Sequence, residues 1–169
     1  MRRLWLIAGL VLAYLLQASF FGAAHLLGVA PNMVLVALVL LVPVLDPSEL
    51  VATAAGIGFG LDMTSGIDFG LRTAFFVMAA LALLVLRNSG VDSERPVTAL
   101  LLVLVAGLAY NLVIATGLIA SGAFPAPWTI LSLGLREFVL NCLCLALLRP
   151  WVVFLRREGR TLTIRRRVA

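Results

Sequence analysis

The sequence predicts an all-α membrane protein that folds as a six-transmembrane-helix bundle. Hydrophobic residues make up 63% of its 169 residues, charged residues only 12%, and the mean hydropathy is +1.13. A soluble domain of this size needs far more polar surface, and the chain has room for one membrane domain only. The apolar residues also fall into six runs, separated by short segments rich in proline, glycine or charge.

The first predicted span covers residues 4–21, which follow two arginines and approach the length of about 20 residues that crosses a bilayer. A basic start before an apolar run also describes a signal peptide, with residues 22–24 as its cleavage region, so removal of this span is an alternative. Gln17 lies late in the span, where we expect its amide to bond to a neighbouring helix.

The second and third predicted spans, residues 33–45 and 50–61, are too short to cross a hydrocarbon core of about 30 Å upright. Pro31 and Asn32 mark the loop before them, and Ser48 is the expected N-cap of the third span. Short segments of this kind tilt, thin the bilayer, or are enclosed by longer helices.

The last three predicted spans, residues 69–86, 97–119 and 128–148, are long enough to cross a membrane. All thirteen basic residues are arginines, and most lie at the chain ends or in the polar loop 87–96. By the positive-inside rule, this distribution places both termini in the cytoplasm and leaves Arg72 near the outer face.

The chain divides into a transmembrane domain, residues 1–155, and a basic cytoplasmic tail, residues 156–169. The arginines of such a tail attract anionic membrane lipid, each by about 1 kcal/mol near the surface. Arginines at the ends of a chain are typical of topology anchors rather than of a basic groove, so we expect no nucleic-acid partner.

Three glycines, Gly56, Gly58 and Gly60, crowd the third span, and the outer two are four residues apart on one helix face. Glycine in a helix interior costs about 1 kcal/mol against alanine in water, but in a membrane its flat surface lets another helix approach closely. Two interpretations follow. The glycines pack the helix inside its own bundle, or they dock a helix of another protein.

Asp62, Asp68 and Arg72 follow the glycines. Asp62 ends the predicted helix, where its charge opposes the helix dipole, so it needs a partner, and Arg72 is the nearest candidate in sequence. The three residues form either an outer loop held by one ion pair or a site for a substrate or partner.

Arg136, Glu137 and Asn141 interrupt the last span. Glu137 and Asn141 are four residues apart and share a face, whereas Arg136 points about 100° away from Glu137. Arg136 lies about 12 Å inside the membrane, counted from the tryptophan that opens the span, where exposure to lipid costs about 3 kcal/mol or more. We therefore expect Arg136 to reach across the bundle to Asp62 or Asp68.

Catalytic motifs are mostly absent, since the sequence contains no HExxH, GxSxG, CxxC or Walker pattern. Ser65 and His25 could serve as nucleophile and base, but both are predicted in or near loops, and the histidine has no orienting partner. A channel lined by charge rings is not indicated, because the interior charges are few and of mixed sign. We expect no enzyme, no metal site and no cofactor.

The first half of the chain carries a set of motif residues in a fixed order, namely Leu16-Gln17, Gly28, Pro31-Asn32, Gly58 and the run Asp62-x-x-Ser65-Gly66-x-x-x-Gly70-Leu71-Arg72. Their order and spacing resemble the glycine-then-aspartate signature of the MreD family, small inner-membrane proteins of the bacterial rod-shape system. The second half agrees only in having further spans and a basic end.

The resemblance implies a non-enzymatic scaffold of the bacterial inner membrane. Such proteins bind MreC and, through it, act with the MreB filament, the RodA glycosyltransferase and its partner transpeptidase in sidewall peptidoglycan synthesis. The expected docking elements are residues 56–61 and 62–72. The family's fold is similar to that of the substrate-binding components of energy-coupling-factor vitamin transporters, so the alternative function is a small solute-binding membrane subunit. A helical packing protein with no fixed partner also fits the composition.

Overall fold

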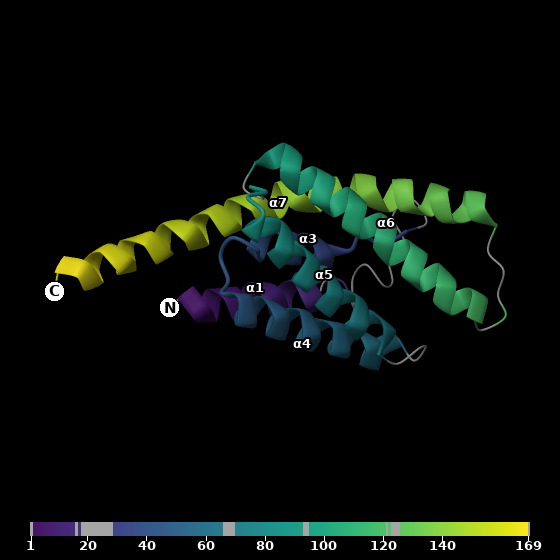
Figure 1. The fold of residues 1–169 in the computed structure, drawn as a ribbon, viewed down its shortest axis with the longest axis horizontal. Coiled ribbons are helices and arrows are strands. Elements are labelled where there is room, and N and C mark those ends of the chain that lie inside the picture. Colours follow the sequence, from purple (N-terminus) through teal and green to yellow (C-terminus); the bar gives the residue numbers. More distant parts are fainter. Residues whose placement is uncertain are drawn as a thin grey trace.

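The computed structural model describes residues 2–15, 17, 29–65, 70–92, 95–120, 122 and 126–168. Within these residues the chain forms six helices and no sheet, so the all-helical prediction is confirmed. The helices are α1 (Arg2–Leu15), α3 (Met33–Leu41), α4 (Pro47–Ser65), α5 (Leu71–Asn88), α6 (Pro96–Ala120) and α7 (Pro127–Val168) (Figure 1).

Three helical segments are long and apolar enough to cross a membrane, namely Leu71–Asn88, Pro96–Ile119 and Trp128–Val153. Many of their aliphatic side chains face outward, as the exposed leucines and valines of α5, α6 and α7 show. Such surfaces are stable against lipid tails, which are as apolar as the side chains themselves. The prediction of a membrane protein with transmembrane helices is confirmed to this extent.

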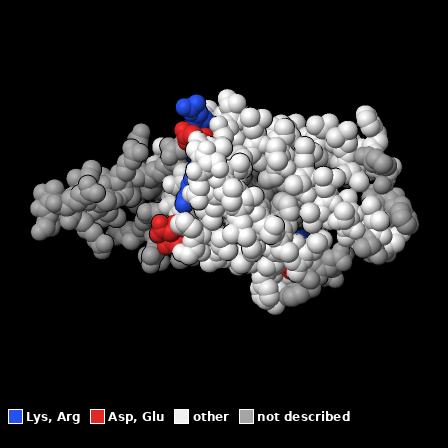
Figure 2. All heavy atoms as spheres, in the orientation of Figure 1, with Lys and Arg blue, Asp and Glu red and all other residues white. Residues whose placement is uncertain are grey.

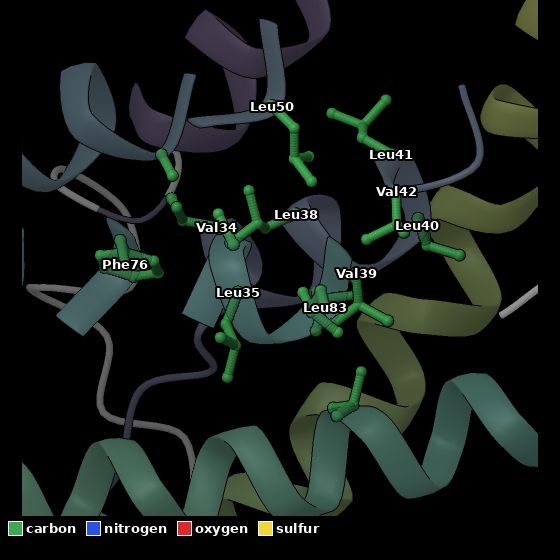
Figure 3. Packing of buried hydrophobic residues seen from close by; sticks show 14 of the residues in the cluster. Val34, Leu35, Leu38, Val39, Leu40, Leu41, Val42, Leu50, Phe76 and Leu83 are labelled. Carbon is green, nitrogen blue, oxygen red and sulfur yellow. The ribbon is translucent and has the colours of Figure 1, made fainter. Parts of the chain in front are cut away.

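The short helix α3 forms the centre of the molecule. All nine of its residues are buried, and α1, α4, α5, α6 and α7 all pack against it (Figure 1). Side chains of α3, among them Leu35, Leu38 and Val39, extend in different directions into the surrounding core (Figure 3). A helix that is apolar on all sides is stable either in a protein core or against lipid, and α3 takes the first of these places. Of the three alternatives for the short segments, α3 shows enclosure by longer helices.

Helix α4 is longer than the predicted third span. It has 19 residues and covers the whole of the range 50–61. Asp46, not Ser48, lies at the N-cap position, because its carbonyl accepts the Leu50 N–H at 2.9 Å. Its own N–H donates to Glu49 Oε2 at 3.5 Å, and a proline, which needs no partner for its nitrogen, opens the helix. The predictions of a short third helix and of Ser48 as its cap are wrong.

Helix α7 is the longest element, with 42 residues, or about 63 Å at 1.5 Å per residue. It continues past residue 148 and through Pro150, so the predicted end of the last span is wrong. A proline removes one helical hydrogen bond, a loss that membrane helices tolerate. The helix extends beyond the bundle across the predicted domain boundary at residue 155, and its end lies on the same side of the molecule as the start of α1 (Figure 1).

The loops that join α3 to α4 and α5 to α6 lie at one end of the bundle. Arg87, near the end of α5, donates from Nη1 to the carbonyls of Val42 and Leu45 in the other loop. The charged atoms visible in Figure 2 also gather mostly toward one end of the described surface, and most of the remaining surface is uncharged. An apolar surface with charge concentrated at an end fits a protein that crosses a membrane.

Several predicted features lie outside the described residues. They are residues 22–24, His25, Gly28, Gly66, Asp68, and the side chains of Ser65 and of residues 156–169.

Candidate functional site

Asp62, in the last turn of α4, joins this helix to the start of α5. The residue is only 2% exposed. Its carboxylate accepts hydrogen bonds from the backbone N–H groups of Gly70 at 3.1 Å, Arg72 at 3.1 Å and Thr73 at 3.0 Å. A fourth bond, at 2.6 Å, comes from the Thr73 hydroxyl. We call these four residues the Asp62 latch.

The latch supplies the N-terminal cap that α5 does not have of its own. The N-cap residue is Gly70, which adopts a left-handed φ of 99° and has no side chain to accept the first N–H groups of the helix. Asp62 provides both the acceptor and the negative charge that a helix N-terminus favours. The structure brings Asp62 and Arg72 together through the backbone N–H of Arg72, and the predicted ion pair between their side chains stays a prediction. The Arg72 guanidinium donates to the Leu61 carbonyl at 3.2 Å.

The three glycines of α4 do not share one packing face. A Cβ atom on Gly58 would lie 2.5 Å from the Cα of Thr73, so α4 and α5 touch there backbone to backbone. A Cβ on Gly60 would lie 3.1 Å from the ring of Tyr14, whose hydroxyl donates to the Gly60 carbonyl at 3.0 Å. Gly56 is exposed and a Cβ there would meet nothing within 4 Å. Gly58 and Gly60 thus pack the bundle itself, and Gly56 alone faces outward.

The buried N-terminus of α3 receives its hydrogen bonds from three side chains. Asn32, the N-cap residue, accepts the Leu35 N–H at 3.0 Å. Gln17 accepts the Val34 N–H at 3.0 Å, which confirms that its amide bonds to a neighbouring helix. Asn141 of α7 accepts the N–H of Asn32 at 2.7 Å. Each acceptor satisfies a donor that helix geometry leaves without a partner and that no bulk water reaches.

The C-terminal end of α3 is completed in the same way, by Arg87. Its Nη1 donates to the Val42 carbonyl at 2.8 Å and to the Leu45 carbonyl at 3.1 Å. Both carbonyls follow the last helical residue, where acceptors lack intrahelical donors and a positive charge is favoured. The sequence had placed Arg87 only in a polar loop, as one of the charges that set topology.

Glu137 of α7 is buried, with 7% exposed, and bonds to two amides. Its Oε2 accepts from Asn111 Nδ2 of α6 at 2.6 Å, and its Oε1 accepts from Asn141 Nδ2 at 3.5 Å. The predicted shared face of Glu137 and Asn141 is confirmed. We call Asn32, Asn111, Glu137 and Asn141 the α3 junction, because they connect α6 and α7 to the start of α3.

Arg136 is exposed, whereas its neighbour Glu137 is buried, so the two side chains take different directions as predicted. The pairing of Arg136 with Asp62 or Asp68 stays a prediction. Pro31, the remaining predicted residue, is buried directly before the cap of α3.

Thr73 and Asn111 contribute to these contacts, and neither was among the predicted site residues. Asn111 gave a visible signal, because an amide in the middle of an apolar span needs a partner inside the bundle. Thr73 gave a weak one, because its hydroxyl binds a residue 11 positions earlier that only the fold brings close.

The latch and the junction fix helix ends and satisfy buried polar groups. Among the described residues, no three His, Cys, Asp or Glu side chains are grouped so that they could hold a metal ion. No family model, curated protein or solved structure matches the chain. Its function is therefore inferred from the residues and contacts described above.

Proposed function

We propose that the chain is a non-enzymatic membrane scaffold of the MreD type, which binds MreC and supports the rod-shape complex in sidewall peptidoglycan synthesis. One observation carries the proposal: the motif residues Gly58, Asp62, Gly70 and Arg72 meet at the contact between α4 and α5. The glycine lets α5 approach, and the aspartate caps it eight to ten residues later in the chain. The spacing of the motif thus has a physical reason in a rigid helix pair.

The direction of the polar groups supports a scaffold. The buried carboxylates of Asp62 and Glu137 accept hydrogen bonds from the protein's own N–H and amide groups. The outward surfaces of α5, α6 and α7 are largely aliphatic. A partner therefore meets rigid apolar helix faces, which suit contact with transmembrane helices through close packing.

We further propose that the chain crosses the bacterial inner membrane six times, with both termini in the cytoplasm. The 19 residues of α4 measure about 28 Å, close to the thickness of a hydrocarbon core. The shorter α1 and α3 complete the count, and enclosure by the other helices allows α3 to be short. An even number of crossings is supported by the position of the start of α1 and the end of α7 on one side of the molecule (Figure 1).

Gly56 is the position at which to test partner binding, because a new side chain there enters open space and leaves the Asp62 latch intact. The experiment co-purifies the chain with affinity-tagged MreC from membranes. It compares the wild type with Gly56→Leu and with Ala82→Leu, which adds the same side chain to an exposed position of α5. We expect Gly56→Leu to bind MreC about tenfold more weakly, or about 1.4 kcal/mol, with unchanged abundance.

Ala82→Leu should bind MreC as the wild type does. If the wild type itself is not recovered with MreC, the scaffold proposal is wrong. If both variants are recovered like the wild type, the outer face of α4 is not the docking surface, and the remaining expected element, residues 62–72, becomes the next one to test.

A further inference from the structure

The α3 junction ends in a hydrogen-bond donor that has no acceptor. Asn32 is 2% exposed, and its Oδ1 accepts the Leu35 N–H at 3.0 Å. This bond fixes which way the amide is oriented, since turning it over would bring Nδ2 against the N–H of Leu35. Among the residues that the structure describes, the buried Nδ2 of Asn32 meets no hydrogen-bond partner.

An unpaired donor in this place is costly. A buried amide N–H without an acceptor costs about 1–3 kcal/mol, and the interior of a membrane bundle has no bulk water to satisfy it. The cost falls on the helix at the centre of the molecule, where all nine residues are buried. Native proteins satisfy such groups with protein atoms or with bound water.

The carboxyl group of the same junction has spare capacity. Glu137 accepts one short bond, 2.6 Å from Asn111, and one of 3.5 Å from Asn141, which is at the limit for a hydrogen bond. Each carboxylate oxygen can accept two bonds, so Oε1 in particular is not saturated. The carboxyl group can therefore accept a further hydrogen bond.

The donors and acceptors select the ligand. The group without a partner is an N–H donor, which a cation cannot satisfy. A carboxyl group beside the site disfavours an anion. The ligand has to accept a hydrogen bond from Asn32 Nδ2, which a water molecule does.

We propose that the α3 junction binds a structural water molecule, which accepts a hydrogen bond from Asn32 Nδ2. The water completes the hydrogen bonds of the junction that links α3, α6 and α7. This inference does not depend on the proposed role in the rod-shape complex.

Water-edited solid-state NMR of the full chain in liposomes tests the site, with water itself as the probe. The measurement compares how fast magnetisation passes from water to the side-chain amide of Asn32 and to the backbone N–H of Leu38. Leu38 is 1% exposed, lies in the same helix and belongs to the buried hydrophobic cluster. We expect transfer to Asn32 to be severalfold faster. Transfer to Asn32 that is as slow as transfer to Leu38 would overturn the proposal.

A substitution gives a second test. Asn32→Thr keeps an oxygen that can cap α3 and replaces the amide donor by a methyl group. If the amide holds a water molecule, the variant displaces it, and we expect Tm to fall by about 2–4 °C. A rise in Tm would mean that the side-chain NH₂ of Asn32 has no water partner and that its removal takes away a destabilising unpaired donor. This result would contradict the proposal. Asn88→Thr, at the exposed end of α5, is the matched control and should leave Tm unchanged.

Discussion

Single polar side chains stabilise this bundle by forming hydrogen bonds with unpaired backbone groups at the ends of another helix. Asp62 caps α5, and Asn141 accepts the backbone N–H of Asn32, the N-cap residue of α3. Arg87 donates to backbone carbonyls that follow α3. In a soluble protein, water competes for such groups and also replaces them when the side chain is removed. Where the bundle excludes water nothing replaces them, so one substitution leaves several backbone groups unpaired.

Asp62→Ala should therefore destabilise the protein strongly. Three backbone N–H groups lose their acceptor, at about 1–3 kcal/mol for each one that stays buried, so we expect a loss of about 2 kcal/mol or more in unfolding free energy. Thr73→Val removes only the hydroxyl bond and should cost about 1 kcal/mol. Unfolding in detergent micelles measures both values. Equal losses in the two variants would show that the backbone bonds of the latch contribute nothing.

The two arginines near the loop after α5 separate capping from topology. Arg87→Gln leaves the carbonyls of Val42 and Leu45 without their donor, and we expect it to lower the unfolding free energy by about 2 kcal/mol. Arg95 pairs with Asp92 at 3.6 Å, but their side chains are 77% and 48% exposed, so Arg95→Gln should change it by about 0.5 kcal/mol or less. Both variants remove one positive charge from one end of the bundle. Equal losses of unfolding free energy in the two variants would show that the hydrogen bonds of Arg87 add no stability and that its charge serves only to set the topology.

At the scale of helices, hydropathy located the long elements and misplaced the ends that tertiary contacts decide. The predicted spans 69–86 and 97–119 differ from α5 and α6 by two residues or fewer at each end. The predicted third span ends too early because its apolar run stops at Asp62. The helix continues through this charged residue only because α5 begins beside it. The end of α7 was drawn too early because Pro150 is a strong breaker in water and a weaker one in a membrane.

For the candidate site, the sequence identifies only one of the two partners in each hydrogen bond. Gln17, Asp62 and Asn141 stood out because a polar side chain in an apolar run requires a partner. Their partners are backbone N–H groups at Val34, Arg72 and Asn32, and every residue except proline carries one, so no sequence pattern marks them.

Because α4 packs closely on α5 at only one of its glycines, we expect alanine substitutions at Gly58 and Gly56 to have opposite effects on stability. Gly58→Ala places a methyl group 2.5 Å from the Thr73 backbone and should lower the unfolding free energy by about 1–3 kcal/mol through overpacking. Gly56→Ala meets open space and should leave the stability unchanged or raise it by about 1 kcal/mol or less, because alanine favours the helix. Thermal unfolding of both variants measures the difference. Equal behaviour would mean that α4 and α5 do not approach closely at Gly58.

At the scale of the whole molecule, the bundle is organised around α3 rather than around a pair of long helices. Five helices contact it, and side chains from α5 and α7 complete its two ends. The enclosure explains how a helix of nine residues, about 14 Å long, can belong to a membrane domain. It also fixes which loops share an end, because Arg87 connects the loop after α3 to the end of α5.

This shared end predicts the orientation of the loops in the membrane. Asp46 and Asp92 are both exposed in the two connected loops, and Ala126 is exposed before α7, beyond the 25 residues of α6. A cysteine is placed at each position in turn, in a chain whose two free cysteines are replaced by alanine, and intact cells are treated with a membrane-impermeant maleimide. The positive-inside rule predicts that Ala126→Cys reacts in intact cells and that Asp46→Cys and Asp92→Cys react only after lysis.

The three positions together test more than which end of the bundle faces the cytoplasm. If Asp46→Cys and Asp92→Cys differ, the loops after α3 and α5 lie on opposite sides of the membrane, which is incompatible with the bond from Arg87 to Val42. If all three react alike, α6 does not cross, although its length of about 37 Å exceeds the hydrocarbon core. If Ala126→Cys is the protected one, the bundle is inverted, and the Asp62 latch lies on the cytoplasmic side.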